Sequence, residues 1–194
     1  MGKTYERIDG RLRAFIESQP VFFIATAPLA DDGHVNVSPK GRSGTLAVLD
    51  ELTLAYLDFG GSTAETIAHL RENGRITLMW CAFTGPPTVV RVHGRGEAVF
   101  RDDPRFAELV GRFAPDADGG GLRAVVLVHA DRVSDSCGFA VPLMDYREDR
   151  SLHSDFFGRK SDPEFAVYCE GKDHVATSID GMPALPLPLP PRPA

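Results

Sequence analysis

The chain has 194 residues, of which 43% are hydrophobic and 25% charged, and its formal net charge is -6. This length suits one domain with an appendage, and the composition excludes a wholly disordered chain. The negative charge gives no general attraction to phosphate backbones or anionic membranes, so neither nucleic acid nor a membrane is expected as a partner. The 19 glycines and 15 prolines predict many turns and few long helices.

The cysteines and histidines are not spaced as metal ligands. Cys81, Cys137 and Cys169 lack the CxxC spacing of zinc ribbons and thioredoxin-like motifs, and the six histidines show no HxH or HExxH pattern. An odd number of cysteines without a signal peptide suits a reducing compartment. The longest strongly apolar stretch, Val21–Ala25, is far shorter than the roughly 20 residues that span a bilayer. We therefore expect a cytoplasmic protein without a bound metal.

The predicted elements begin with a helix over Tyr5–Gln19, where apolar residues recur at steps of three and four and Pro20 ends the pattern. Runs of β-branched and aromatic residues then predict six strands, and two shorter helical patterns lie between them. In chain order these are strands Val21–Thr26, Val35–Ser38 and Leu52–Asp58, helix Ser62–Asn73, strands Arg75–Phe83 and Thr88–Phe100, helix Asp103–Phe113 and strand Leu122–Ala130.

Most of these strands are joined by hairpins, which excludes a doubly wound parallel sheet because that fold needs a helix between nearly every pair of strands. The pattern predicts a mainly β fold, an antiparallel barrel with peripheral helices. After Asp131 the pattern weakens, and residues 149–170 are expected to form helical pieces that cover the barrel. The expected units are a barrel domain at 1–135, a helical extension at 136–182 and a mobile Pro-rich tail at 183–194.

Two segments carry residue types suited to an anion. Gly60 and Gly61 precede a predicted helix that opens with Ser62 and Thr63, and a helix start offers unpaired N–H groups to a phosphate. The more common interpretation of this pattern is a capping box, in which Glu65 reaches back to Ser62. From the residues alone both interpretations stay open.

The second segment follows the strand that ends near Ser38. Lys40 and Arg42 supply two positive charges around Gly41, which could bind an anion or form a solvated basic loop. Arg91 and Arg95 alternate with apolar residues on a predicted strand and so share one face.

The order of four segments resembles the pyridoxamine 5′-phosphate oxidase-like family of flavin-binding split β-barrels. The segments are Val35–Gly41, Tyr56–Thr63, Arg71–Met79 and Val90–Gly96, and the resemblance covers about residues 15–130. The stretches 136–143 and 178–181 look like a subgroup of that family without a settled reaction. The resemblance implies a six-stranded antiparallel split barrel of Greek-key type. It also implies a homodimer that binds FMN at the subunit interface.

The resemblance further implies which residues contact FMN. The backbone of Asn36, Val37 and Ser38 would lie beside the isoalloxazine ring. Lys40 matches a strand-end lysine near the flavin, where a cation would favour the reduced, anionic form.

The remaining implied contacts come from two other strands and a helix start. Leu57 and Asp58 would lie beside the ring or the ribityl chain, and Ser62 and Thr63 would hold the phosphate. Arg91 would contact the phosphate or the subunit interface.

Two departures from the family pattern affect the expected reaction. Authentic oxidases carry an Arg-Lys pair after the helix-start serine, where this chain has Thr63 and Ala64. The C-terminal basic and histidine residues that bind the vitamin B6 phosphate have no counterpart in the Pro-rich tail. We therefore expect an FMN-dependent oxidoreductase that acts on an unknown small substrate or NAD(P)H and is not an authentic pyridoxamine phosphate oxidase.

Two alternatives stay open at this point. One is a deazaflavin-dependent reductase, and the other is a non-catalytic protein that binds or stores flavin. No residue is singled out as a catalytic acid or base.

Overall fold

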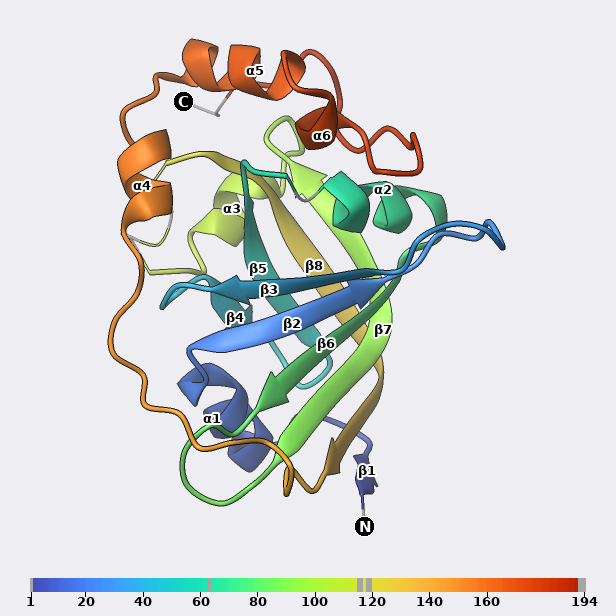
Figure 1. Cartoon of the computed structure of the whole chain (residues 1–194), viewed down its shortest axis with the longest axis vertical. Coiled ribbons are helices and arrows are strands. Elements are labelled where there is room, and N and C mark those ends of the chain that lie inside the picture. Colours follow the sequence, from blue (N-terminus) through green and yellow to red (C-terminus); the bar gives the residue numbers. More distant parts are fainter. Residues whose placement is uncertain (1, 63, 115–116, 118–119, 192–194) are drawn as a thin grey trace.

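A single curled antiparallel sheet organises the molecule, as a computed structural model of the chain shows for residues 2–62, 64–114, 117 and 120–191 (Figure 1). The strands in this part of the chain are β1 (Lys3–Tyr5), β2 (Val21–Thr26), β3 (Asn36–Gly41), β4 (Leu46–Val48), β5 (Thr53–Phe59), β6 (Arg75–Cys81), β7 (Val89–Phe100) and β8 (Leu122–Ser136). The helices are α1 (Gly10–Ser18), α2 (Ala64–Asn73), α3 (Phe106–Val110), α4 (Leu152–Phe157), α5 (Asp162–Glu170) and α6 (Asp173–Ala176).

The strands follow the order β3-β2-β6-β7-β8-β5-β4, and β1 pairs with β8 outside this path. All of these pairings are antiparallel. The β7–β8 register shifts between His93 and Gly94, as the strand glycines predict. A Cβ at Gly94 would lie 2.0 Å from the His129 carbonyl oxygen, so this close crossing requires glycine. The prediction of a mainly β, antiparallel split barrel with peripheral helices is confirmed.

The barrel encloses an apolar core. Phe22 from β2 packs between Tyr56 of β5 and Trp80 of β6, with ring centroids 5.8 and 5.9 Å away. Leu12 and Ile16 of α1 are fully buried against the same core. The i, i+4 spacing of these two residues places them on one helix face, which explains why α1 closes one end of the barrel.

The bounds of several predicted elements differ from the structure. Strand Val35–Ser38 becomes Asn36–Gly41, which places Lys40 within β3, and helix Asp103–Phe113 shortens to Phe106–Val110. The prediction of six strands is too low, because β1 and β4 add two three-residue strands among the described residues. The first helix starts at Gly10 instead of Tyr5, since the Asp9 side chain accepts from the Leu12 N–H and caps it there. Strand β8 continues to Ser136 instead of ending at Ala130, because residues 132–136 keep pairing with β7.

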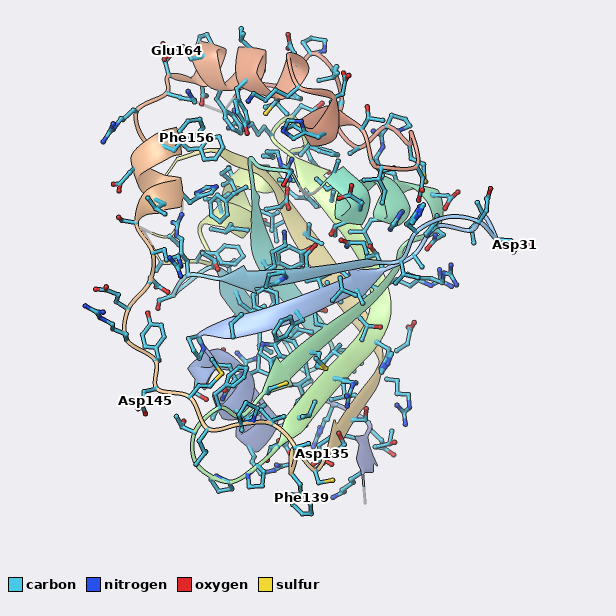
Figure 2. All side chains as sticks on the ribbon, in the orientation of Figure 1. Asp31, Asp135, Phe139, Asp145, Phe156 and Glu164 are labelled. Atoms are coloured by element: carbon cyan, nitrogen blue, oxygen red, sulfur yellow. The ribbon has the colours of Figure 1, made fainter. Side chains whose placement is uncertain are left out.

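Helices α5 and α6 cover the end of the barrel where α2 lies (Figure 1). After β8 the chain climbs one side of the molecule past Phe139 and Asp145 to Phe156 (Figure 2). Helices α4 and α5 then contribute Phe157 and Phe165 to a second apolar cluster, which includes Ala64 and Ile67 of α2.

Part of the Pro-rich segment also belongs to this second cluster. Ala184, Leu185 and Leu189 are buried in it, whereas residues 192–194 of the expected tail lie outside the described residues. The division into units at 135 and 182 stays a prediction. Within the part of the chain described, no helix has the length and apolar character to cross a bilayer, and the cytoplasmic location also stays a prediction.

Candidate functional site

Strand β3 carries four of the predicted site residues. Side chains alternate along a strand, so Asn36, Ser38 and Lys40 share one face while Val37 points to the other. Val37 is accordingly 65% exposed and Ser38 only 5%. The three residues predicted to lie beside the flavin ring, Asn36, Val37 and Ser38, therefore have side chains on opposite faces of the strand.

The side chains of Asn36 and Ser38 belong to a buried hydrogen-bond network. The Asn36 amide donates to the hydroxyls of Thr26 and Thr66, each at 3.0 Å, and Ser38 Oγ donates to Asn36 Oδ1 at 2.9 Å. Thr26 Oγ1 lies 2.9 Å from His69 Nδ1. This network ties β3 to β2 and α2, so these two side chains position the strand that carries Lys40.

Lys40 stands near the end of β3 and is half-buried. Burial lowers the pKa of Lys40, the carboxylates of Asp58 and Glu65 oppose that shift, and the guanidinium of Arg123 adds to it. A buried ammonium gains more from an anion than an exposed one does, because water screens it less.

The pair Asp58–Arg123 is fully buried, and the charges of both side chains act on Lys40. Arg123 Nη2 lies 2.8 Å and Nε 2.9 Å from Asp58 Oδ2, and Nη1 lies 3.5 Å from the Gly61 carbonyl oxygen. The Asp58 side chain therefore faces the interior, while Leu57 beside it lines a cavity. Sequence reasoning missed Arg123. The sequence feature that could have identified Arg123 is that it is the single charged residue inside the apolar run Leu122–Val128.

The Gly60–Gly61 turn joins β5 to α2 and packs closely on the C-terminal extension. The Gly60 N–H donates to the Gly121 carbonyl at 2.7 Å. A Cβ at Gly60 would lie 2.6 Å from the Phe165 ring and 3.0 Å from that of Phe157. Glycine is therefore required here for close packing.

The start of α2 bears on whether Ser62 belongs to a phosphate site or to a capping box. Ser62 is exposed directly before α2, and Thr63 lies outside the described residues. Glu65 Oε1 accepts from the Ile179 N–H at 3.2 Å. The carboxylate that a capping box would use thus contacts the C-terminal segment.

Arg42 lies just beyond β3 in an unusual backbone conformation. Its φ of 77° makes it the only non-glycine residue with positive φ in the described part of the chain. Its guanidinium carbon sits 4.8 Å from the centroid of the Phe59 ring, and Nη2 donates to the Ala117 carbonyl. Such an outlier points to a functional constraint.

His153 reaches the same place from α4. Its Nε2 lies 3.1 Å from the Gly60 carbonyl oxygen, and its ring contacts Phe59 and Phe157 at centroid distances of 5.2 and 4.6 Å. No local pattern in the sequence marks this histidine, because its contacts with Phe59 and Gly60 join it to a segment far earlier in the chain.

These side chains surround a cavity of about 260 Å³. Its described lining includes Lys40, Arg42 and His153 but no carboxylate, and its apolar walls are Phe22, Leu57 and Phe59. It adjoins a cavity of about 490 Å³ that shares Lys40, Arg42 and His153 and is also lined by Glu148 and Asp149. In a chain of net charge -6, a pocket whose charged groups among the described residues are all basic is suited to an anion.

Arg91 does not join this group. Its Nη1 donates to Ser136 Oγ at 3.0 Å, and on β7 it pairs with Met79 and Ser134 of the neighbouring strands. It is absent from the described lining of both cavities. Its contact with a phosphate or with a second subunit stays a prediction.

Comparisons with known proteins agree with this architecture. The family model described as pyridoxamine 5′-phosphate oxidase matches residues 8–137. The pyridoxamine 5′-phosphate oxidase family protein ustO of Aspergillus flavus is 37% identical over 193 residues, which cover 93% of this chain and 77% of that protein. The crystal structure of the conserved hypothetical protein Rv2991 from Mycobacterium tuberculosis matches with a TM-score of 0.50 at 17% identity, over 73% of this chain and 92% of that one. That structural likeness concerns the fold alone.

Proposed function

Because the chain belongs to the pyridoxamine 5′-phosphate oxidase family, we propose that it binds FMN beside Lys40 and acts as an FMN-dependent oxidoreductase. The observation that carries the proposal is the cavity without a carboxylate in its described lining, which joins Lys40 and Arg42 to the Gly60–Gly61 turn. A bound flavin would supply hydride or electron transfer to and from a small substrate.

The residues present fit such a cofactor. Ser62, which lies directly before α2, and Thr63, which is outside the described residues, would meet the phosphate, since a helix dipole favours negative charge at its N-terminus. Lys40 would place its ammonium near the ring. Leu57 and Phe59 would exclude water from it, and the strand backbone at Asn36–Ser38 would run alongside.

The interior pair Asp58–Arg123 has a supporting role in this proposal. Its side chains are buried, so they would act on the cofactor by holding the Gly61 carbonyl and by setting the charge around Lys40. We also propose that two copies of the chain form a dimer with the flavin between them, to which Arg91 would contribute. Light scattering of the purified protein gives the mass that tests this.

Titration of the protein with FMN, followed by the flavin absorbance band and by fluorescence quenching, tests the cofactor. We expect Lys40→Met to weaken binding and to lower the flavin potential, and Lys172→Met, a distant lysine beside Tyr168, to change neither. The double variant Ser62→Ala with Thr63→Ala should lose roughly 1–3 kcal/mol of binding free energy if both hydroxyls bond the phosphate. Absence of FMN uptake by the wild-type protein, or uptake of a deazaflavin in its place, would overturn the proposal.

A further inference from the structure

We propose that a groove on the outer face of the sheet binds a small dianion between two arginines, Arg75 of β6 and Arg95 of β7. The groove has a volume of about 440 Å³, and its described lining also includes Thr77, His93 and Asp131. None of its described lining residues belongs to the cavity that contains Lys40. The inference therefore goes beyond the proposed flavin site and does not depend on it.

The first support is the position of the two arginines. β6 and β7 run side by side (Figure 1), and Arg75 lies directly opposite Arg95 in their antiparallel register. Ile76, the next residue of β6, is buried in the core, so alternation turns Arg75 outward, and directly opposite residues share a face. Both arginine side chains are exposed. Like charges directly opposite each other destabilise a strand pair, and an anion between them removes that repulsion.

The second support is the hydrogen bonding of the two guanidiniums. Arg75 Nε donates to Asn73 Oδ1 at 3.3 Å, and its Nη2 donates to the Pro28 carbonyl at 3.1 Å. Arg95 Nη1 donates to the Asn73 carbonyl at 2.6 Å. These bonds anchor one side of each guanidinium beside the last residue of α2. Arg75 Nη1 and both Nε and Nη2 of Arg95 make no hydrogen bond with a described residue, so each arginine keeps donors for a ligand.

The third support is the shortage of carboxylates around these arginines. Within the described part of the chain, neither guanidinium forms an ion pair. Glu72, next to Asn73, accepts instead from the Leu29 N–H at 2.8 Å and from the Asn73 amide at 3.2 Å. Asp131 is the single carboxylate in the described lining of the groove. Two guanidiniums therefore share a groove with one carboxylate, which leaves its charge positive.

The arrangement of charges indicates a compact ligand with two negative charges. Each guanidinium presents a planar set of donors that matches one edge of a carboxylate or phosphate. The Cβ atoms of directly opposite residues lie roughly 4.5–5.5 Å apart, so one small dianion can meet both Arg75 and Arg95. The rest of this face is also basic, since burial and the charges of Arg132 and Arg91 lower the pKa of His93. A singly charged ligand would leave one of the two arginines without a partner.

Calorimetric titration of the full chain with succinate, inorganic phosphate and singly charged propionate tests the inference, at low ionic strength and a pH at which phosphate is doubly charged. We expect at least one dianion to bind, and propionate to bind about tenfold more weakly or not at all. Arg75→Gln and Arg95→Gln should each weaken the dianion about tenfold or more, because a charge-assisted contact is lost. Arg159→Gln, an exposed arginine of the extension, is the matched control and should change nothing. The tighter dianion identifies carboxylates or phosphate as the recognised group.

Thermal unfolding provides a second readout and shows that each variant is folded. A saturating dianion should raise the Tm of the wild type, because it binds the native state alone, and should not raise the Tm of either arginine variant. No binding of either dianion, equally tight binding of propionate, or unchanged dianion affinity in both arginine variants would overturn the inference. A dianion that is lost in Lys40→Met and kept in Arg95→Gln binds in the cavity of Lys40, which would also overturn it.

Discussion

Arg123 shows how one buried charge organises the candidate site. It stands in β8 between apolar residues and is fully buried, which is tolerable only because Asp58 on the neighbouring strand neutralises it. The same guanidinium reaches toward the Gly61 carbonyl at 3.5 Å. The interior ion pair thus fixes the turn that leads into α2.

Removing one member of this pair should be costly. We expect Arg123→Met to lose roughly 3–5 kcal/mol of unfolding free energy, because it leaves the Asp58 carboxylate buried without its partner. The double variant Asp58→Leu with Arg123→Met should lose less than Arg123→Met alone. Urea unfolding followed by the fluorescence of Trp80, the single tryptophan, measures both. Losses that simply add would show that the two side chains act independently.

At the residue scale the sequence predicts the surface of the site better than its interior. Lys40, Leu57 and the Gly60–Gly61 turn line one cavity. Lys40 and the turn are marked by their own residue types, whereas Leu57 is expected only from the family resemblance, and contact of these residues with a cofactor stays a prediction. Asn36 and Ser38 also lie on β3, but their side chains serve the buried network with Thr26 and Thr66. Such partnerships form between distant segments, and no local spacing records them.

Two elements far apart in sequence are joined by a small electrostatic contact. His34, at the end of the loop between β2 and β3, lies with Nδ1 2.6 Å from Asp180 Oδ1, and its backbone N–H donates to Asp180 Oδ2 at 2.9 Å. The hydrogen bond and charge of Asp180 raise the pKa of His34, and the hydrogen bonds from His34 lower the pKa of Asp180. The contact attaches this loop to the C-terminal segment 178–182, whose Ile179 N–H donates to Glu65.

This contact should depend on pH in a defined direction. A raised histidine pKa contributes stability that is fully present below the unfolded value of 6.5 and is lost as pH rises through the folded pKa. A lowered aspartate pKa contributes stability present above the unfolded value of 3.8 and lost as pH falls through the folded one. The contact therefore holds between the two folded pKa values.

An NMR titration of the His34 ring checks this dependence. We expect an inflection above pH 6.5 in the wild-type protein and a return toward that value in Asp180→Asn, with faster amide exchange at residues 178–182. Asp173→Asn, a distant carboxylate on α6, should leave the His34 titration unchanged. If His34 titrates identically in the wild type and in Asp180→Asn, the contact between His34 and Asp180 does not form in solution.

At the element scale most of the longer strands are predictable, except for the C-terminal end of β8, and the shortest strands are not. β2, β5, β6 and β7 carry enough β-branched and aromatic residues to identify them within a residue or two. β1 and β4 span three residues each, which is too short for a period of two to emerge. They form because partners on β8 and β5 supply hydrogen bonds.

The whole molecule depends on how the C-terminal extension docks against the barrel. Phe157 and Phe165 pack over the β5–α2 turn, and their rings approach Gly60 so closely that no side chain fits there. His153 stands on the same helix as Phe157 and completes the cavity wall. The cavity of the candidate site is therefore complete only when the C-terminal extension is docked against the barrel.

A methyl group at Gly60 should push the Phe157 and Phe165 rings of the C-terminal extension away from the β5–α2 turn. We expect Gly60→Ala to lose about 1–3 kcal/mol of unfolding free energy through overpacking and to raise amide exchange in α4 and α5 above that in the barrel strands. Gly10→Ala is the matched control, since a Cβ there meets nothing within 4 Å. Unchanged exchange in α4 and α5 of Gly60→Ala would mean that the aromatic layer yields without undocking.

The contact between His153 and Gly60 spans 93 residues, and this separation has a consequence for how the protein acquires its site during synthesis. Chains emerge from the ribosome N-terminus first, and contacts of long sequence separation form late because the intervening loop must close. The barrel strands up to Ser136 can pair before α4 exists. Until α4 arrives, Phe59 lacks the His153 contact and the cavity lacks its outer wall. A newly made chain therefore holds a folded sheet before the candidate site is complete.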